Sequence, residues 1–247
     1  MLSIKNLQVV AGWKEIIQDV SLDLELWKNY VILGKNGSGK STLSWAIAGN
    51  PKYSVASGSI TLDGKNLLSM PPEERSQAGI FLSFQNIPEI KWVNLSEYLR
   101  TIYNHRLERV SPETKVLSPF LFKRFIKKYL EELKIPEEFL NRDLNVGFSG
   151  WEKRKIEILQ MKLLEPKYII LDEIDSGLDV DAFRTIAQLL KGLVSPTNSL
   201  IIITHYFNIL EYVPYDEVIV LEDGKVRLKW GKEIIEEVKK SGFEMLK

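Results

Sequence analysis

Apolar residues follow two different patterns along this chain. At 2–7 and 21–26 they alternate with polar residues, which is typical of strands that bury only one face. At 30–33, 167–171 and 200–203 they form continuous runs, which is typical of parallel strands covered by helices on both faces. The sequence therefore predicts an α/β fold in which an antiparallel sheet precedes a mainly parallel one.

Between 92 and 145 the apolar pattern changes to helical spacing. Apolar positions recur three and four residues apart, so each predicted helix has one apolar face. We expect a helical subdomain at 92–145, inserted into a single domain whose α/β core comprises 1–91 and 146–247. The positions that carry the helical pattern are Leu95, Tyr98, Leu99, Ile102, Phe122, Phe125, Ile126, Tyr129, Leu130 and Leu133.

The composition is that of an ordinary globular protein. Of the 247 residues, 45% are hydrophobic and 27% are charged, and 33 lysines and arginines balance 33 aspartates and glutamates. This balance provides no general attraction for nucleic acid, and no apolar run reaches the length of a transmembrane helix. We expect a cytoplasmic protein with no nucleic-acid binding and no direct membrane insertion. Because the chain has no cysteine, it cannot hold an iron–sulfur cluster through thiolates.

The stretch 34–41 fits the pattern G-x-x-x-x-G-K-[ST]. It lies between the apolar run 30–33 and a helix-like segment at 42–48, the context in which this pattern binds phosphate. Its glycines allow successive N–H groups to point at phosphate oxygens, and the following helix adds its positive end. We expect Lys40 to reach the β- and γ-phosphates of ATP and Ser41 to bind Mg2+. The predicted nucleotide contacts are Gly34, Lys35, Asn36, Gly37, Ser38, Gly39, Lys40, Ser41 and Thr42.

Polar residues follow three of the apolar runs. Asp172 and Glu173 come directly after the run 167–171. Gln85 follows a further apolar run at 80–84, and His205 lies two residues after the run 200–203. In open α/β sheets the carboxyl ends of strands line the ligand crevice, so we expect these side chains beside the phosphate loop. Asp172, Ser41 and Gln85 are the predicted magnesium ligands. Glu173 is the predicted catalytic group that orients or deprotonates the attacking water, with Gln85 and Lys40 beside it.

A helix start at 149–152 supplies a further candidate site. Ser149 and Glu152 form an S-x-x-E capping box, which by itself explains both residues structurally. A capped helix start also offers free N–H groups and positive dipole to an anion. Ser149 and Gly150 are therefore candidates for contact with the γ-phosphate of a nucleotide bound to another subunit.

In this order the motifs resemble those of the ABC-type ATPases, over nearly the whole chain. The resemblance implies a P-loop NTPase core with an N-terminal antiparallel β subdomain and an inserted helical subdomain. It also implies an ATP-dependent head-to-tail homodimer, in which Ser149 and Gly150 contact the nucleotide held by the other subunit. Asp179 would couple the two nucleotide sites, and His205 would sense the γ-phosphate. The segments that carry the resemblance are 34–41, 85, 149–150, 169–173, 176–179 and 204–205.

Within that superfamily the chain is similar to the SufC family, the soluble ATPases of the Suf iron–sulfur cluster assembly machinery. The similar segments are 79–85, 147–150, 157–166, 172–182 and 204–206. This resemblance implies a motor that hydrolyses ATP with Mg2+ and rearranges soluble scaffold partners resembling SufB and SufD. The absence of cysteine agrees with a motor whose partner holds the cluster.

Two other functions remain open at this stage. The ATP-binding subunit of a membrane ABC transporter shares all the core motifs and differs in its partner. A nucleotide-binding regulatory module would result if Trp151 weakened hydrolysis, and Glu173-dependent hydrolysis would exclude it. The adenine contact is poorly defined, because the expected aromatic position falls near Ala11 and Trp13 is only its neighbour.

Trp151 departs from the family pattern, which has a second glycine after Ser149-Gly150. Glycine permits close backbone approach to a phosphate, whereas an indole must point away from the interface or crowd it. We expect Trp151→Gly to increase ATP-driven pairing and turnover, measured by light scattering and phosphate release. Identical rates in both proteins would show that the indole points harmlessly away.

Overall fold

The computed structural model describes residues 1–174, 178–204, 207–230, 235 and 238. These residues form two compact units. The first comprises the described parts of 1–85, 166–176 and 194–247, and the second those of 86–165 and 177–193.

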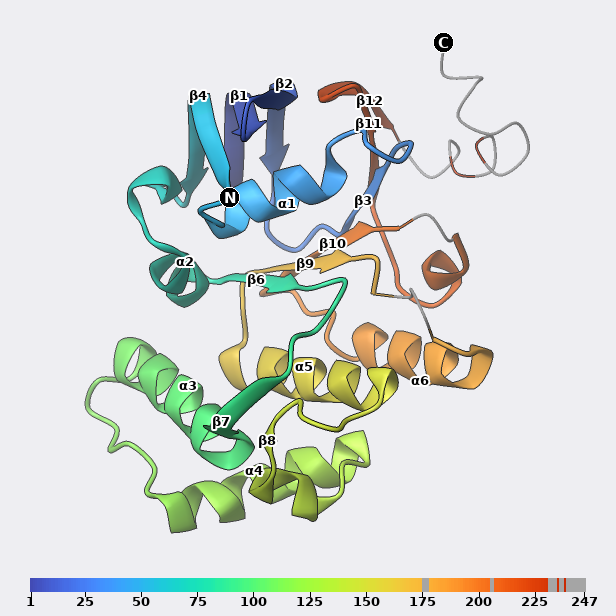
Figure 1. Cartoon of the computed structure of the whole chain (residues 1–247). Coiled ribbons are helices and arrows are strands. Elements are labelled where there is room, and N and C mark those ends of the chain that lie inside the picture. Colours follow the sequence, from blue (N-terminus) through green and yellow to red (C-terminus); the bar gives the residue numbers. More distant parts are fainter. Residues whose placement is uncertain (175–177, 205–206, 231–234, 236–237, 239–247) are drawn as a thin grey trace. The chain divides into compact units, whose positions relative to one another are not determined.

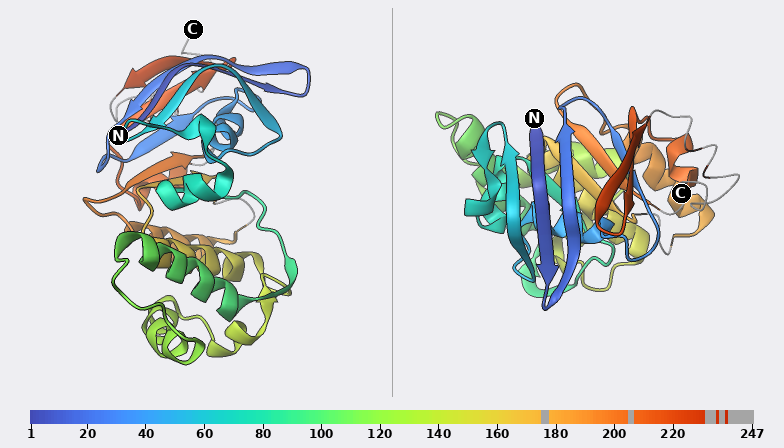
Figure 2. Two further views of the ribbon diagram at one scale, coloured as in Figure 1. Left: turned by 90° about the vertical axis from the view of Figure 1, so that its left-hand side faces the viewer. Right: turned by 90° about the horizontal axis from the view of Figure 1, so that it is seen from above.

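An antiparallel sheet begins the first unit. Strand β1 (Leu2–Ala11) pairs on one side with β2 (Lys14–Leu24) and on the other with β4 (Tyr53–Leu62). Figure 2 shows these three strands side by side. The short β5 (Lys65–Asn66) pairs with β4 at the edge. The predicted antiparallel sheet is confirmed. Strand β1 continues past the predicted 2–7, whereas β2 begins before the predicted 21–26 and ends at Leu24.

The same sheet continues into a mainly parallel part. Its strands are β3 (Tyr30–Leu33), β6 (Ile80–Ser83), β9 (Tyr168–Asp172), β10 (Ser199–Ile203), β11 (Glu217–Glu222) and β12 (Lys225–Trp230). Within the described residues the order is β5-β4-β1-β2-β12-β11-β3-β10-β9-β6 (Figure 1). Pairs from β11 to β6 are parallel, and β12 returns antiparallel to β11. All residues of β9 and β10 are buried, as predicted from their apolar runs.

Two helices of the first unit lie against this sheet. Helix α1 (Lys40–Ala48) contacts β1, β2 and β4 as well as β6 and β9, so it packs between the two parts of the sheet (Figure 1). Helix α2 (Pro72–Ala78) begins with proline, a residue favoured in the first turn of a helix. Among the described residues, this unit also contains the 3-10 helices Leu67–Ser69 and Phe207–Glu211. The charged segment 232–241, whose sequence predicts a final helix, falls largely outside the described residues.

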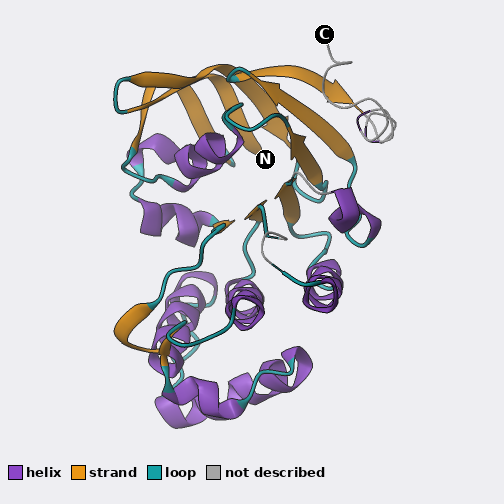
Figure 3. Ribbon diagram, turned by 45° about the vertical axis from the view of Figure 1, so that its right-hand side comes forward, coloured by secondary structure: helices purple, strands orange, loops and turns teal. Residues whose placement is uncertain are grey.

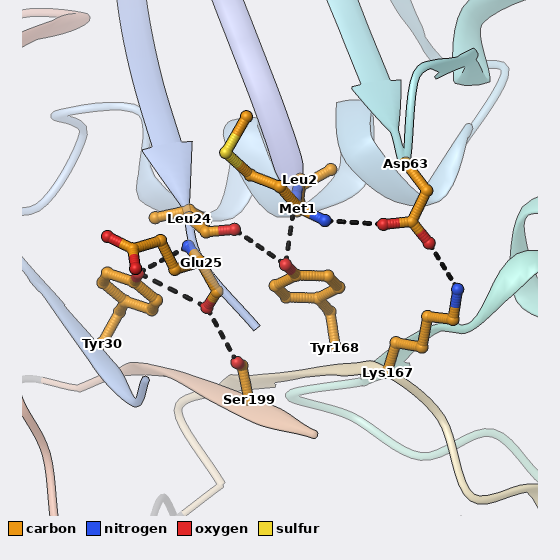
Figure 4. A network of polar contacts seen from close by, with 9 residues as sticks. All are labelled: Met1, Leu2, Leu24, Glu25, Tyr30, Asp63, Lys167, Tyr168 and Ser199. Atoms are coloured by element: carbon orange, nitrogen blue, oxygen red, sulfur yellow. Dashed lines mark hydrogen bonds and ion pairs between the residues drawn. The ribbon is translucent and has the colours of Figure 1, made fainter. Parts of the chain in front are cut away.

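Two buried tyrosines join the two parts of the sheet (Figure 4). The hydroxyl of Tyr168 in β9 accepts from Leu2 N (3.0 Å) and donates to Leu24 O (2.7 Å). The hydroxyl of Tyr30 in β3 accepts from Glu25 N (2.7 Å). Burial raises the pKa of both phenols to about 12, so their hydroxyl groups stay protonated and able to donate. The parallel strands therefore fix the ends of β1 and β2.

The second unit is mainly helical (Figure 3). Its helices are α3 (Leu95–Val110), α4 (Pro119–Leu133), α5 (Gly150–Leu164) and α6 (Val180–Lys191), with a 3-10 helix at Glu137–Asn141. Strands β7 (Ile90–Asn94) and β8 (Asp143–Leu144) form a small antiparallel pair. No described helix is long and apolar enough to cross a membrane.

The second unit extends beyond the predicted helical subdomain at 92–145. Helix α5 contacts α3, α4 and α6, so it belongs to this unit rather than to the α/β core. The sequence also missed the pair β7–β8, which marks both ends of the predicted segment. Such short strands carry too few residues for a period-two pattern.

Tyr168→Phe tests the junction within the first unit. The substitution leaves a buried N–H and a buried carbonyl without their partner, which costs about 1–3 kcal/mol of unfolding free energy. Tyr53→Phe is the matched control, because the Tyr53 hydroxyl makes no hydrogen bond within the described residues. Urea denaturation of both variants measures the difference. Equal losses would contradict a role for the Tyr168 hydroxyl.

Candidate nucleotide-binding site

The segment 34–41 connects β3 to α1 and lies close against the hairpin of β11 and β12. Gly34 has φ +157°, and a Cβ there would lie 2.2 Å from the carbonyl oxygen of Leu221 in β11. The hairpin turn is bonded to the same loop, since Gly224 N donates to Ser38 O (3.1 Å). Only glycine permits this approach of two backbones, so the first glycine of the motif is required by packing as well as by turn geometry.

Lys40 is folded back over the loop. Its ammonium group donates to the carbonyl oxygens of Gly34 (2.8 Å) and Lys35 (3.0 Å), and the residue is only 5% exposed. Burial lowers the pKa of Lys40, whereas the carboxylates of Glu173 and Asp172 act in the opposite direction. The loop therefore holds a poorly hydrated cation where the helix α1 begins, together with the unpaired amides of its first turn.

Two of the predicted side-chain pairs are in contact within the first unit. Ser41 Oγ donates to Asp172 Oδ1 at 3.2 Å, so a hydroxyl and a carboxylate lie together beside the loop. Gln85 Nε2 donates to Glu173 Oε2. The structure thus brings together four predicted residues, from the ends of β6 and β9 and from the loop.

Glu173 has an unusual backbone. Its φ is +49°, in the left-handed region that residues other than glycine and asparagine rarely adopt. Its N–H donates to Ile203 O (2.9 Å), which holds it to the end of β10. A conformation of this kind costs about 1–3 kcal/mol and commonly marks functional positions.

An aromatic pair connects α1 with the segment that carries Gln85. Trp45 stacks on Phe84 with ring centroids 5.0 Å apart and an interplanar angle of 21°. Trp45 lies one helical turn after Lys40, and Phe84 directly precedes Gln85. The pair fixes the amide of Gln85 relative to the helix that follows the phosphate loop.

A cavity of about 1000 Å³ opens beside the loop within the first unit. One end consists of the loop, the start of α1 and Glu173, and the other consists of β2 and the β11–β12 hairpin. Its size suits a nucleotide. The described residues that line it are Lys14, Glu15, Ile16, Gln18, Asn36, Gly37, Gly39, Lys40, Ser41, Thr42, Glu173, Glu222, Asp223, Lys225, Val226 and Arg227.

Sequence reasoning missed the far end of this cavity. Its residues come from β2 and from the hairpin near the end of the chain, and nothing in their local sequence marks a ligand. Trp13, the neighbour of the expected adenine contact, is fully exposed and is not among the described residues that line the cavity. Lys14, the next residue, does line the cavity.

Three predicted residues lie in the second unit. Ser149 is the N-cap of α5, and its N–H donates to Glu152 Oε2 (2.8 Å), so the predicted capping box forms. The hydrogen bond from the Ser149 side chain is the main cause that lowers the pKa of Glu152. Gly150 is the first residue of the helix and is exposed. Asp179 caps α6 through a hydrogen bond from Ala182 N (2.8 Å).

Trp151 packs along its own helix. The Lys155 ammonium lies 4.2 Å from the centre of the indole ring and donates to Lys134 O at 3.0 Å. This cation–π contact holds the indole, which is 38% exposed. The predicted γ-phosphate sensor, His205, lies outside the described residues.

A family model matches the part of the chain that contains most of this site. Residues 17–176 match the family described as "ABC transporter", a segment that contains the phosphate loop, Gln85, Ser149 and Glu173. The chain belongs to the ABC transporter ATPase family. This ABC protein is an ATPase, as the sequence predicted.

Relatives match this ABC ATPase over its whole length. A probable ATP-dependent transporter of Synechocystis is 42% identical over 246 residues, covering 100% of this chain and 95% of the relative. Vegetative protein 296 of Bacillus subtilis is also 42% identical, with 100% and 93% covered. ABC transporter I family member 6, chloroplastic, of Arabidopsis thaliana is 39% identical, with 100% and 73% covered.

Solved ABC cassettes have the same fold. A nucleotide-free ATP-binding cassette from an ABC transporter superposes with TM-score 0.75 at 25% identity, covering 98% of this chain and 95% of that one. A dimeric cassette bound to ADP and Pi, in a post-hydrolysis state, has TM-score 0.75 at 22% identity, with 94% and 98% covered. The predicted ABC-type α/β fold is confirmed.

A pair of glycine variants tests the packing of the loop. Gly34→Ala places a methyl group 2.2 Å from Leu221 O, and overpacking of this kind costs about 1–3 kcal/mol. At Gly37, with φ +81°, an added Cβ meets nothing within 4 Å. We expect Gly34→Ala to lower both unfolding free energy and ATP affinity clearly more than Gly37→Ala does. The contact between loop and hairpin would be disproved by equal effects in calorimetry.

Proposed function

We propose that this ABC ATPase is the motor subunit of an iron–sulfur cluster assembly complex. In this proposal two chains pair head to tail on ATP, and hydrolysis rearranges soluble scaffold partners that resemble SufB and SufD. The observation that carries it is the resemblance to the SufC family at residues beyond the general ABC motifs, in 79–85, 157–166 and 172–182. The absence of cysteine supports a role in which the partner holds the cluster.

The contacts beside the phosphate loop support a hydrolytic role for each residue. Lys40 binds the β- and γ-phosphates once it exchanges the loop carbonyls for phosphate oxygens. Ser41, Asp172 and Gln85 would hold Mg2+, and their hydroxyl, carboxylate and amide oxygens are the ligands that this ion prefers. When bound, the ion neutralises charge on the phosphates.

Glu173 acts on the attacking water. The water oxygen forms a bond to the γ-phosphorus while the bond to the β–γ bridging oxygen breaks, and the proton of the water passes to the Glu173 carboxylate. The hydrogen bond from Gln85 to Glu173 supports this role, because it fixes the direction of the carboxylate. ADP and phosphate are the products.

The second half of the site comes from a partner subunit in this proposal. Ser149 and Gly150 open α5 with exposed backbone, and a helix start of this kind attracts the charge of a γ-phosphate. Asp179 couples the two sites, and His205 senses the γ-phosphate. The capping box supports this role, since it fixes the first turn of α5 before any phosphate arrives.

A second candidate is the ATP-binding subunit of a membrane transporter. The names of several full-length relatives favour it, because they read "probable ATP-dependent transporter". Both candidates use the same hydrolytic site and differ only in what the ATPase moves. The partner therefore decides between them.

Glu173→Gln tests the hydrolytic site. The variant keeps the phosphate contacts and loses the base, so it should bind ATP, accumulate a closed dimer and lose turnover by about 10²-fold or more. Size-exclusion chromatography with ATP and a phosphate-release assay measure both effects. Lys40→Ala is the contrasting variant and should lose nucleotide affinity itself. Normal hydrolysis by Glu173→Gln would refute the assignment, and undiminished ATP binding by Lys40→Ala would refute the phosphate loop.

Isolation from native extract tests the partner. The tagged chain is captured with ATP, and the proteins that elute with it are identified by mass spectrometry. Soluble scaffold proteins that carry cluster ligands support the proposed function. A protein with several membrane spans would overturn it in favour of the transporter.

A further inference from the structure

The cavity beside the phosphate loop is larger than the phosphates of a nucleotide require. Its volume is about 1000 Å³, and half of its lining lies away from the loop, on β2 and the β11–β12 hairpin. If the loop binds the phosphates of ATP, as proposed above, this second end receives the base and sugar. The side chains at this second end therefore determine how much affinity the base adds to that of the phosphates.

This end of the cavity contains aliphatic and charged side chains. Ile16 of β2 and Val226 of β12 are half-buried and supply apolar surface. None of the lining residues that the structure describes is aromatic. The lining residues that the structure describes therefore offer a base no aromatic ring on which to stack.

The only flat cation among the described lining residues is the guanidinium of Arg227. Its Nε donates to Glu222 Oε2 (2.8 Å), and both side chains line the cavity from neighbouring strands of one hairpin. The side chain of Arg227 is 62% exposed and that of Glu222 is 28% exposed, so water screens this ion pair. The pair therefore orients the guanidinium and adds little to the free energy of unfolding. A guanidinium presents a planar face that stacks on aromatic rings, including bases.

The hairpin is fixed relative to the phosphate loop. Gly224 at its turn accepts from Gln18 N (2.9 Å) through its carbonyl and donates to Ser38 O (3.1 Å) through its N–H. A Cβ at Gly224 would lie 2.2 Å from the carbonyl oxygen of Ile16. The distance between the phosphate end and the base end of the cavity is therefore set by backbone contacts, which suits a ligand of fixed length.

We propose that Arg227 is the platform on which the nucleotide base stacks, oriented by Glu222 and flanked by Ile16 and Val226. This inference rests on the proposed nucleotide site and adds its base-binding residue. Stacking on a guanidinium depends on the area of the ring and not on its edge groups. The site therefore takes purine nucleoside triphosphates as a class, with ATP and GTP bound about equally and CTP bound more weakly.

Calorimetric titration of three ligands into the full chain tests the platform. ATP, GTP and inorganic tripolyphosphate are titrated without divalent metal, so that no hydrolysis occurs. Arg227→Ala should weaken ATP and GTP by about 10-fold and tripolyphosphate by less than about 2-fold. Arg227→Lys should behave toward ATP like Arg227→Ala, because it keeps the charge and loses the planar face.

Lys225→Ala is the matched control for charge. Lys225 lines the same cavity from the same strand, two residues before Arg227, so its loss should weaken all three ligands by one common factor. The proposal is overturned if Arg227→Lys binds ATP as the native chain does. It is also overturned if Arg227→Ala weakens tripolyphosphate as much as ATP.

The two proposals fail in different ways. A native chain that binds tripolyphosphate and ATP equally well has no base platform, yet it can still hydrolyse ATP through Glu173. A native chain that binds neither ligand contradicts the nucleotide site itself. The decisive quantity is the ratio of the ATP and tripolyphosphate affinities of one variant. Partial unfolding lowers the apparent binding of both ligands alike, so it cannot produce the expected change in this ratio.

Discussion

The close approach of two backbones, at Gly34 and Leu221, determines how this site is built. It places the phosphate loop against β11, and the bond from Gly224 to Ser38 extends that contact to the hairpin turn. Any side chain at position 34 would separate them. The sheet order explains why this matters, since β11 and β12 link the parallel strands to β2. One packing contact therefore sets the phosphate end and the far wall of the cavity together.

The charges of the site are arranged before any ligand is present. Lys40 loses hydration and in exchange donates hydrogen bonds to the loop carbonyls, and the carboxylates beyond it offset part of the cost of burial. Asp172 ends a fully buried strand, and the N–H of Glu173 donates to Ile203 O (2.9 Å), so both carboxylates are held at the end of the parallel strands. A phosphate that takes the place of the loop carbonyls finds the cation already within the loop, which reduces the reorganisation that binding requires.

Sequence patterns identified the parts of this molecule that depend on local chemistry. The run at 30–33 coincides with β3, the S-x-x-E box forms at Ser149, and the motif at 34–41 lies between a strand and a helix. Contacts between residues that lie far apart in the sequence could not be predicted from these patterns. The wall formed by Ile16 and Arg227 depends on sheet order, and the membership of α5 in the second unit depends on packing that hydrophobic spacing does not specify.

The stacked pair of Trp45 and Phe84 has an optical consequence. Indole emission responds to the polarity and rigidity of its surroundings, and Trp45 is half-buried between α1 and the segment before Gln85. Trp13 and Trp92, by contrast, are almost fully exposed and already in water. Any rearrangement that separates Gln85 from α1 changes the surroundings of Trp45 far more than theirs. The chain thus carries its own fluorescent reporter at the point where α1 meets the rest of the candidate site.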